Sequence, residues 1–135
     1  MRNIINVREK METPLKLKAT EDTPEVVLDK KNNEFSLTGR SLPEDAFEFY
    51  EPIIAWMKAY VKQPNPSTEF QVKMDYFNSS SVKQVFDLLM LLEDIIKAEK
   101  EAKIVWWYHE DDELMEIKGK EFQEMLNIHF ALRAY

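Results

Sequence analysis

The sequence has no cysteine and only two glycines among its 135 residues. Without cysteine, disulfides, thiolate catalysis and cysteine-ligated zinc are excluded. Two glycines leave little room for the glycine-rich loops that cradle phosphate groups. The sequence also lacks an apolar run long enough for a signal peptide or a membrane span, so we expect a cytoplasmic protein without membrane insertion.

Basic residues are the minority among the charged ones, with 18 Lys and Arg against 25 Asp and Glu. The resulting net charge of −7 opposes binding to the phosphate backbone, so we expect no nucleic acid partner. At 44% hydrophobic residues, the chain is apolar enough to build one core. We expect a flexible N-terminal extension at residues 1–12 and a single domain at 13–135, with no metal and no cofactor.

The spacing of apolar residues predicts an α/β (α+β) fold, in which helices pack on a mixed β-sheet. Single strands that alternate with helices imply right-handed crossovers. The predicted strands lie at 15–19, 25–29, 34–38, 68–77, 104–108 and 128–132, and the predicted helices at about 41–62, 78–96 and 111–124.

Several residues carry more specific structural predictions. Ser41 is expected to cap the first helix, and Pro52 inside that helix predicts a kink or two short helices. Tyr76 is expected on the same face of its strand as Met74. Gly119 is expected to interrupt the last helix. The expected apolar faces of the first two helices include Phe47, Tyr50, Ile54, Trp56, Met57 and Val61, and Val82, Val85, Phe86, Leu89, Leu92 and Ile96, respectively.

Ser79, Ser80 and Ser81 follow the best candidate for a central strand and open the most amphipathic helix. Helix N-termini at the carboxyl ends of strands present free N–H groups and a positive dipole end, which suit a phosphoryl group. The dipole contributes about 0.3–1 kcal/mol, too little to refold a domain. Burying a phosphate in a binding surface without a cation costs about several kcal/mol, so phosphorylation would switch binding. By local pattern alone a helix cap is the commoner role, and residues 81–84 form a possible capping box.

Four segments resemble the SiaC family of regulatory phosphoproteins, small bacterial proteins whose fold is similar to that of anti-sigma-factor antagonists (STAS domains). They are residues 19–26 (ATEDTPEV), 39–44 (GRSLPE), 49–53 (FYEPI) and 76–83 (YFNSSSVK), and the last is the most specific. In the family a threonine typically follows the asparagine and is phosphorylated. The resemblance therefore implies phosphorylation of Ser79, with Ser80 and Ser81 as alternatives.

The resemblance also implies protein partners and a non-enzymatic role. Family members cycle between a dedicated Ser/Thr kinase and a PP2C-like phosphatase, and the unmodified form binds and activates a diguanylate cyclase, which implies cyclic-di-GMP and biofilm signalling. We expect Asn78, Ser80 and Lys83 to shape the surface that kinase and effector read. Lys83 is also a candidate for pairing with the phosphate.

Two other functions are compatible with the sequence. One is a partner-switching protein that acts on an anti-sigma factor. The other is a small hydrolase that uses the acidic run at residues 110–113 together with His109. Because adjacent carboxylates point in different directions, a solvated helix start is the favoured reading of that run. Trp106, Trp107 and Tyr108 are expected to be buried alternately against a helix and an edge rather than to stack nucleobases.

Overall fold

The computed structural model describes residues 13–135, and the extension predicted for residues 1–12 lies outside this range. It contains a six-stranded sheet with the strand order β1-β2-β3-β4-β5-β6, which confirms the predicted mixed sheet with helices. Within the described range, no helix is long and apolar enough to cross a membrane. The elements are β1 (Leu15–Leu17), β2 (Glu25–Asp29), β3 (Glu34–Ser41), α2 (Ala46–Tyr60), β4 (Ser67–Phe77), α3 (Ser79–Met90), α4 (Glu93–Lys97), β5 (Glu101–Tyr108), α5 (Glu113–Met125) and β6 (His129–Ala134).

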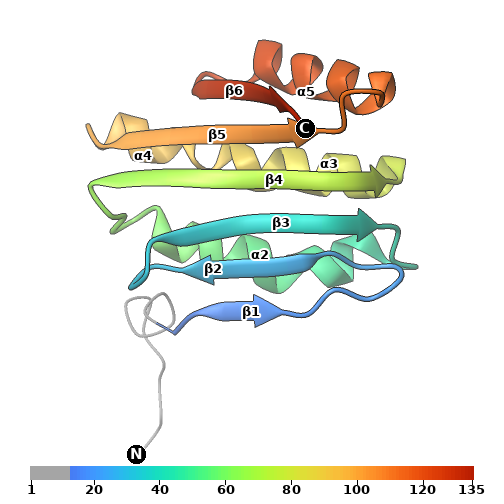
Figure 1. Ribbon diagram of the computed structural model, residues 1–135. Coiled ribbons are helices and arrows are strands. Elements are labelled where there is room, and N and C mark those ends of the chain that lie inside the picture. Colours follow the sequence, from blue (N-terminus) through green and yellow to red (C-terminus); the bar gives the residue numbers. More distant parts are fainter. Residues whose placement is uncertain (1–12) are drawn as a thin grey trace, which may run out of the picture.

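Helices cover one face of the sheet, and no helix of residues 13–135 lies on the other face (Figure 1). β1, β2 and β3 pair antiparallel, whereas β3 to β6 pair parallel. Each parallel pair is joined through helices, and every crossover steps in the same direction along the sheet. Crossovers of one hand that step in one direction place their helices on the same face. Because α2, α3 and α5 each follow a parallel strand in the chain, all three begin at the edge where those strands end.

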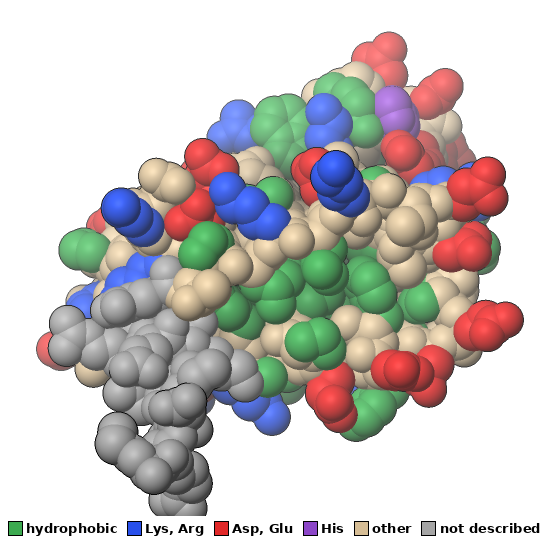
Figure 2. All heavy atoms as spheres, turned by 90° about the horizontal axis from the view of Figure 1, so that it is seen from below, with side chains coloured by type: hydrophobic (Ala, Val, Ile, Leu, Met, Phe, Trp, Pro, Cys, Tyr) green, Lys and Arg blue, Asp and Glu red, His purple; other side chains and the backbone are tan. Residues whose placement is uncertain are grey.

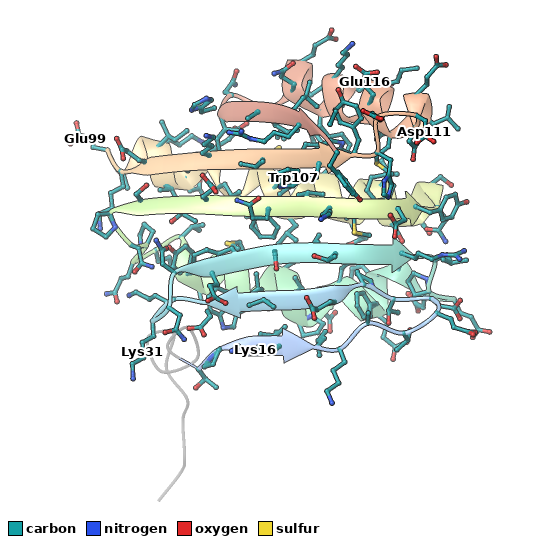
Figure 3. All side chains as sticks on the ribbon, in the orientation of Figure 1. Lys16, Lys31, Glu99, Trp107, Asp111 and Glu116 are labelled. Carbon is teal, nitrogen blue, oxygen red and sulfur yellow. The ribbon has the colours of Figure 1, made fainter. Side chains whose placement is uncertain are left out.

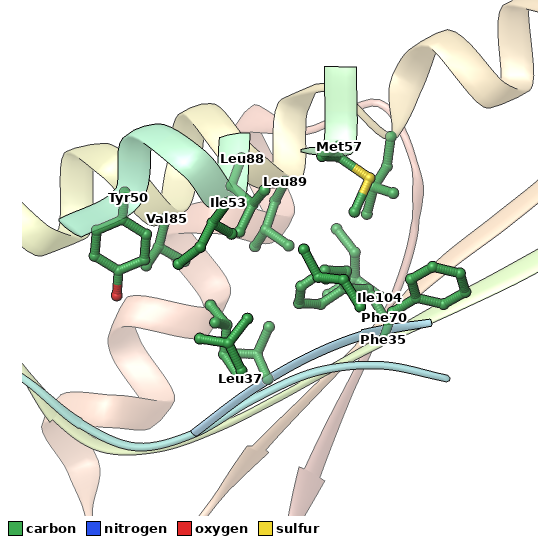
Figure 4. Packing of buried hydrophobic residues seen from close by; sticks show 14 of the residues in the cluster. Phe35, Leu37, Tyr50, Ile53, Met57, Phe70, Val85, Leu88, Leu89 and Ile104 are labelled. Atoms are coloured by element: carbon green, nitrogen blue, oxygen red, sulfur yellow. The ribbon is translucent and has the colours of Figure 1, made fainter. Parts of the chain in front are cut away.

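The core lies between the sheet and this helix layer (Figure 4). Tyr50 and Trp56 of α2 are buried, as predicted. The ring of Tyr60 stacks on that of Trp56 at 5.5 Å and lies 4.8 Å from that of Phe35 on β3. Such aromatic pairs contribute beyond the area that they bury. At the edge formed by β1 and α2, hydrophobic side chains also reach the surface, bordered by acidic ones (Figure 2).

The first helix differs from its prediction in three ways. Ser41 is no cap, because β3 extends to it and its side chain is fully buried; Asp45 caps α2 by accepting a hydrogen bond from the Glu48 N–H at 3.0 Å. Of the two alternatives expected at Pro52, two short helices is wrong, since α2 runs unbroken through this residue. Phe47 lies on the solvent side and is 64% exposed.

The long apolar stripe predicted after residue 78 is divided between two helices. α3 ends at Met90 and α4 begins at Glu93, so the helical phase changes between them. Ile95 is therefore the buried residue, whereas Ile96, which the uninterrupted spacing placed in the core, is 40% exposed.

A bulge near the end of β4 turns Tyr76 away from the core. Gly39 of β3 pairs with Met74, but the next residue, Arg40, pairs with Tyr76, so Asp75 is the additional residue. One extra residue inverts the alternation of side chains. Tyr76 is consequently 49% exposed instead of sharing the face of Met74, and Phe77 is buried. Gly39 adopts φ 116° beside the bulge, a conformation that other residues rarely reach.

Gly119 does not interrupt α5 but brings it close to the sheet. A Cβ atom at this position would lie 2.6 Å from Trp106 Cδ1 and 2.6 Å from Leu132 Cδ2. Trp106 is buried under the helix and its Nε1–H donates to the Met115 carbonyl at 3.1 Å. Trp107 lies on the opposite face of the sheet (Figure 3), so the two tryptophans do alternate, but Trp107 is half-buried on a sheet face rather than buried against an edge.

Candidate functional site

The serine cluster lies where β4 ends and α3 begins, at the edge of the sheet that holds the helix starts (Figure 1). Asn78 is the N-cap residue: its Oδ1 accepts a hydrogen bond from the Ser81 N–H at 2.9 Å. The same oxygen accepts one from the Ser80 hydroxyl at 3.2 Å. The capping box predicted to start at Ser81 is therefore wrong, because Asn78 already satisfies the free N–H group.

The three serines have different environments. Ser81 is fully buried, whereas Ser79 and Ser80 are exposed. The Ser80 hydroxyl is bonded to Asn78. Among the described residues, the Ser79 hydroxyl has no hydrogen-bond partner. Ser79 is therefore the serine whose hydroxyl an external enzyme can reach without first breaking a contact.

A buried chain of hydroxyl groups supports the start of α3 from below. The Ser41 hydroxyl donates to Ser81 Oγ at 2.9 Å and shares a hydrogen bond of 2.7 Å with the Tyr50 hydroxyl. The Asn78 N–H donates to the Ser41 carbonyl at 3.0 Å. Burial raises the pKa of Tyr50 to about 12, although the hydrogen bond with Ser41 partly opposes this, so the phenol stays protonated at neutral pH. These hydrogen bonds connect β3, α2 and the first turn of α3, the turn in which Ser79 lies.

The electrostatic surroundings of Ser79 suit an anion only in part. Its position at the first residue of α3 places it at the positive end of the helix, and the first turn contains no acidic residue. Lys83 lies one turn further, on the same side of the helix. However, its Nζ lies 3.1 Å from Asp87 Oδ2, and a phosphate on Ser79 would compete with Asp87 for it.

The acidic run at residues 110–113 has a structural role at the start of α5. Asp112 caps the helix by accepting from the Met115 N–H at 3.0 Å. Asp111 lies beside the helix start at the outer end of the molecule (Figure 3). His109 does not join the run: its Nε2 lies 3.2 Å from Asp75 Oδ1 and 3.0 Å from the Tyr135 hydroxyl. The arrangement proposed for a hydrolase is thus not assembled by these side chains.

Sequence reasoning missed a groove at the same end of the molecule. It has a volume of about 380 Å³ and lies between the end of β4 and the first half of α5. Tyr76 lines it because of the β4 bulge. The sequence did hold one signal, since Leu114 and Ile117 are apolar and three residues apart in a helix with few apolar residues.

Comparisons with known proteins agree with this architecture. The chain is 27% identical to an uncharacterised protein of Pseudomonas aeruginosa (strain UCBPP-PA14) over 121 residues, which cover 90% of this chain and 96% of that protein. It is similar to the crystal structure of apo-SiaC from Pseudomonas aeruginosa, with a TM-score of 0.81 and 27% identity over 90% of this chain and 99% of that one.

A second solved structure contains such a relative with its partner. It shows the diguanylate cyclase SiaD in complex with its activator SiaC from Pseudomonas aeruginosa, and the match has a TM-score of 0.83 at 27% identity, over 90% of this chain and 99% of the other. The model of the SiaC family matches residues 17–135, nearly all of the described fold. The chain therefore belongs to the SiaC family of regulatory phosphoproteins.

Proposed function

We propose that this chain is a non-enzymatic, cytoplasmic signalling protein whose binding to an effector is controlled by phosphorylation of Ser79. The observation that carries the proposal is the exposed Ser79 hydroxyl, which has no hydrogen-bond partner among the described residues and opens α3. A Ser/Thr kinase adds the phosphate and a PP2C-like phosphatase removes it. The effector is a diguanylate cyclase, so the protein acts in cyclic-di-GMP and biofilm signalling.

Membership in the SiaC family supports the choice of effector. A relative of 27% identity is the activator of the diguanylate cyclase SiaD and is seen in complex with it. The buried hydroxyl chain below α3 supports a protein that presents a rigid surface to its partner. Asn78, Ser80 and Lys83 surround Ser79 on that surface and contribute to its recognition.

Phosphorylation of Ser79 is expected to change binding and to leave the fold intact. Among residues 13–135 the exposed Ser79 hydroxyl has no hydrogen-bond partner, so its modification breaks no hydrogen bond within this part of the chain. Interaction of the phosphate with the helix dipole amounts to about 0.3–1 kcal/mol, small against a domain stability of about 5–15 kcal/mol. A partner that covers Ser79 must instead desolvate a charge of about −2, which costs about several kcal/mol unless the partner supplies a cation.

The proposal can be tested by phosphorylating the protein with an extract of its source bacterium and ATP, and locating the phosphate by mass spectrometry. Binding to purified diguanylate cyclases of that bacterium is then measured for the wild type, Ser79→Ala and Ser79→Asp. We expect phosphate on Ser79, binding by the alanine variant, and binding weakened at least about tenfold in the aspartate variant.

Ser67→Ala and Ser67→Asp are matched controls, because Ser67 is also an exposed serine but lies at the start of β4, at the opposite end of that strand from Ser79. They should bind the cyclase as the wild type does. The proposal would be contradicted by phosphate at another position, or by cyclase binding that is the same for the wild type and both variants at residue 79. Ser79 would then be only the first residue of a helix.

A further inference from the structure

The groove between β4 and α5 combines an apolar floor with exposed apolar walls. Phe77 and Met115 form the floor and are buried. Of the walls, Leu114 is 81% exposed, Ile117 53% and Tyr76 49%. Large apolar side chains that stand together at the surface of a folded domain mark an interaction site more often than isolated ones do.

The spacing of the groove residues on α5 matches the side of a helix that packs against another helix. Leu114, Ile117, Lys118 and Glu121 occupy positions i, i+3, i+4 and i+7. This stripe extends over two turns, or about 10 Å, which is the repeat that ridges-into-grooves packing uses. The other side of the groove is the end of β4. An occupant that lies along α5 would therefore also contact Asp75 and Tyr76.

The charged residues that line the groove are mostly acidic. Asp75 on β4 and Asp112 at the start of α5 line it, and Glu121 lies further along α5. Lys118 is the one basic residue among the described residues that line the groove, and its Nζ lies 3.1 Å from Glu121 Oε1. An acidic border around an apolar centre selects a partner surface with the opposite charge.

We propose that this groove is a docking site for an amphipathic helix of another protein, whose apolar side chains pack against Tyr76, Leu114 and Ile117. Lysine or arginine side chains beside that apolar stripe pair with the acidic border. This is helix-in-groove recognition, read through residues spaced three, four and seven apart. The inference goes beyond the proposed function, because Ser79 does not line the groove and the docking does not depend on the phosphorylation state of Ser79.

Two synthetic helical peptides of about 15 residues test the inference. Both carry leucine at i, i+3, i+4 and i+7; the remaining positions are mainly lysine in one and mainly glutamate in the other. Binding to the whole protein is measured by fluorescence anisotropy. We expect the Leu–Lys peptide to bind roughly tenfold or more tightly than the Leu–Glu peptide. Amide NMR shifts on addition of the Leu–Lys peptide should concentrate at residues 75–77 and 112–121.

Matched variants distinguish binding in the groove from nonspecific electrostatic attraction of the Leu–Lys peptide to an acidic protein. Leu114→Ser and Ile117→Ser should each lower the affinity for the Leu–Lys peptide roughly tenfold. Met125→Ser should have no effect, because Met125 is 57% exposed on the same helix but does not line the groove. Glu121→Gln should weaken binding, whereas Glu124→Gln, also exposed on α5, should not.

The inference is overturned if the Leu–Lys peptide fails to bind, if both peptides bind equally, or if Leu114→Ser and Ile117→Ser bind as the wild type does. NMR shifts confined to another surface would also overturn it. None of these outcomes bears on Ser79, whose test measures phosphate incorporation and cyclase binding.

Discussion

The Ser41 hydroxyl donates a hydrogen bond of 2.9 Å to the Ser81 hydroxyl, across 40 positions of the sequence. The contact joins the last residue of β3 to the first turn of α3 inside the core. It explains why Ser81 is unavailable for modification while its neighbours Ser79 and Ser80, in the same helical turn, remain exposed. The contribution of this buried contact to stability can be tested by mutation.

Removing the Tyr50 hydroxyl should weaken this buried chain. In Tyr50→Phe, Ser41 loses its 2.7 Å partner while the aromatic packing stays, so we expect a loss of about 1 kcal/mol in the free energy of unfolding. Chemical denaturation measures it. Tyr76→Phe is the control and should change stability by less than about 0.5 kcal/mol, because Tyr76 is 49% exposed. Equal losses of stability in the two variants would show that the hydrogen bond between Tyr50 and Ser41 does not stabilise the fold.

Asn78 should contribute to stability as a helix cap. Asn78→Ala removes the oxygen that accepts from the Ser81 N–H, and we expect it to lower the free energy of unfolding by about 0.5–2 kcal/mol. Asn78→Asp keeps the acceptor and should be close to the wild type. The pair can be compared by thermal or chemical unfolding. If the aspartate variant is as unstable as the alanine variant, loss of the capping hydrogen bond is not the reason for the lower stability.

Gly119 should not tolerate even a methyl group. The Cβ of Gly119→Ala would lie 2.6 Å from Trp106 Cδ1, a rigid ring that is itself buried under α5. Overpacking of this kind costs about 1–3 kcal/mol, and it should outweigh the better helix propensity of alanine. Glu124→Ala, at an exposed position of the same helix, serves as the control in urea unfolding. Stabilisation by Gly119→Ala would mean that α5 lies further from the sheet.

Asp29 should make stability depend on pH. Hydrogen bonds from the Asn32 side chain and N–H, and then the charge of Lys16, lower the pKa of its buried carboxylate, although burial opposes them. A carboxylate with a folded-state pKa below the unfolded value of about 3.9 stabilises the fold above that value, and this contribution is lost as the pH falls through the folded-state pKa.

The Asp29→Asn variant tests this sign. It should be clearly less stable than the wild type near neutral pH, and the difference should shrink as the pH falls below about 4. Asp94→Asn is the control, because the Asp94 side chain is 51% exposed and its pair with Lys97 is a surface one. A difference between Asp29→Asn and wild type that stays constant down to low pH would contradict the assignment.

The candidate site could be predicted in position but not in detail. Ser79 was assigned to a helix start from the polar residues that end β4 and the apolar spacing that follows, and α3 does begin there. The pattern could not separate Ser79 from Ser81, because three consecutive serines have the same local propensity. Their difference arises from the buried Ser41 and Tyr50, which are distant in sequence.

The errors in the predicted core have a common cause. Tyr76 and Ile96 were both placed by continuing a regular period beyond the point where the element changes. A bulge at Asp75 shifts the first, and the break after Met90 shifts the second. Neither irregularity has a strong signal in the residues themselves.

By itself, the sequence determined the order of the strands and of the helical segments between them, and the helix start at Ser79, because alternation and helical spacing act over a few neighbouring residues. Only the tertiary structure decided which serine is exposed, how closely α5 approaches the sheet at Gly119, and that Tyr76 joins Leu114 in one groove. These features depend on pairing register and on packing between elements far apart in the chain. No local pattern encodes them.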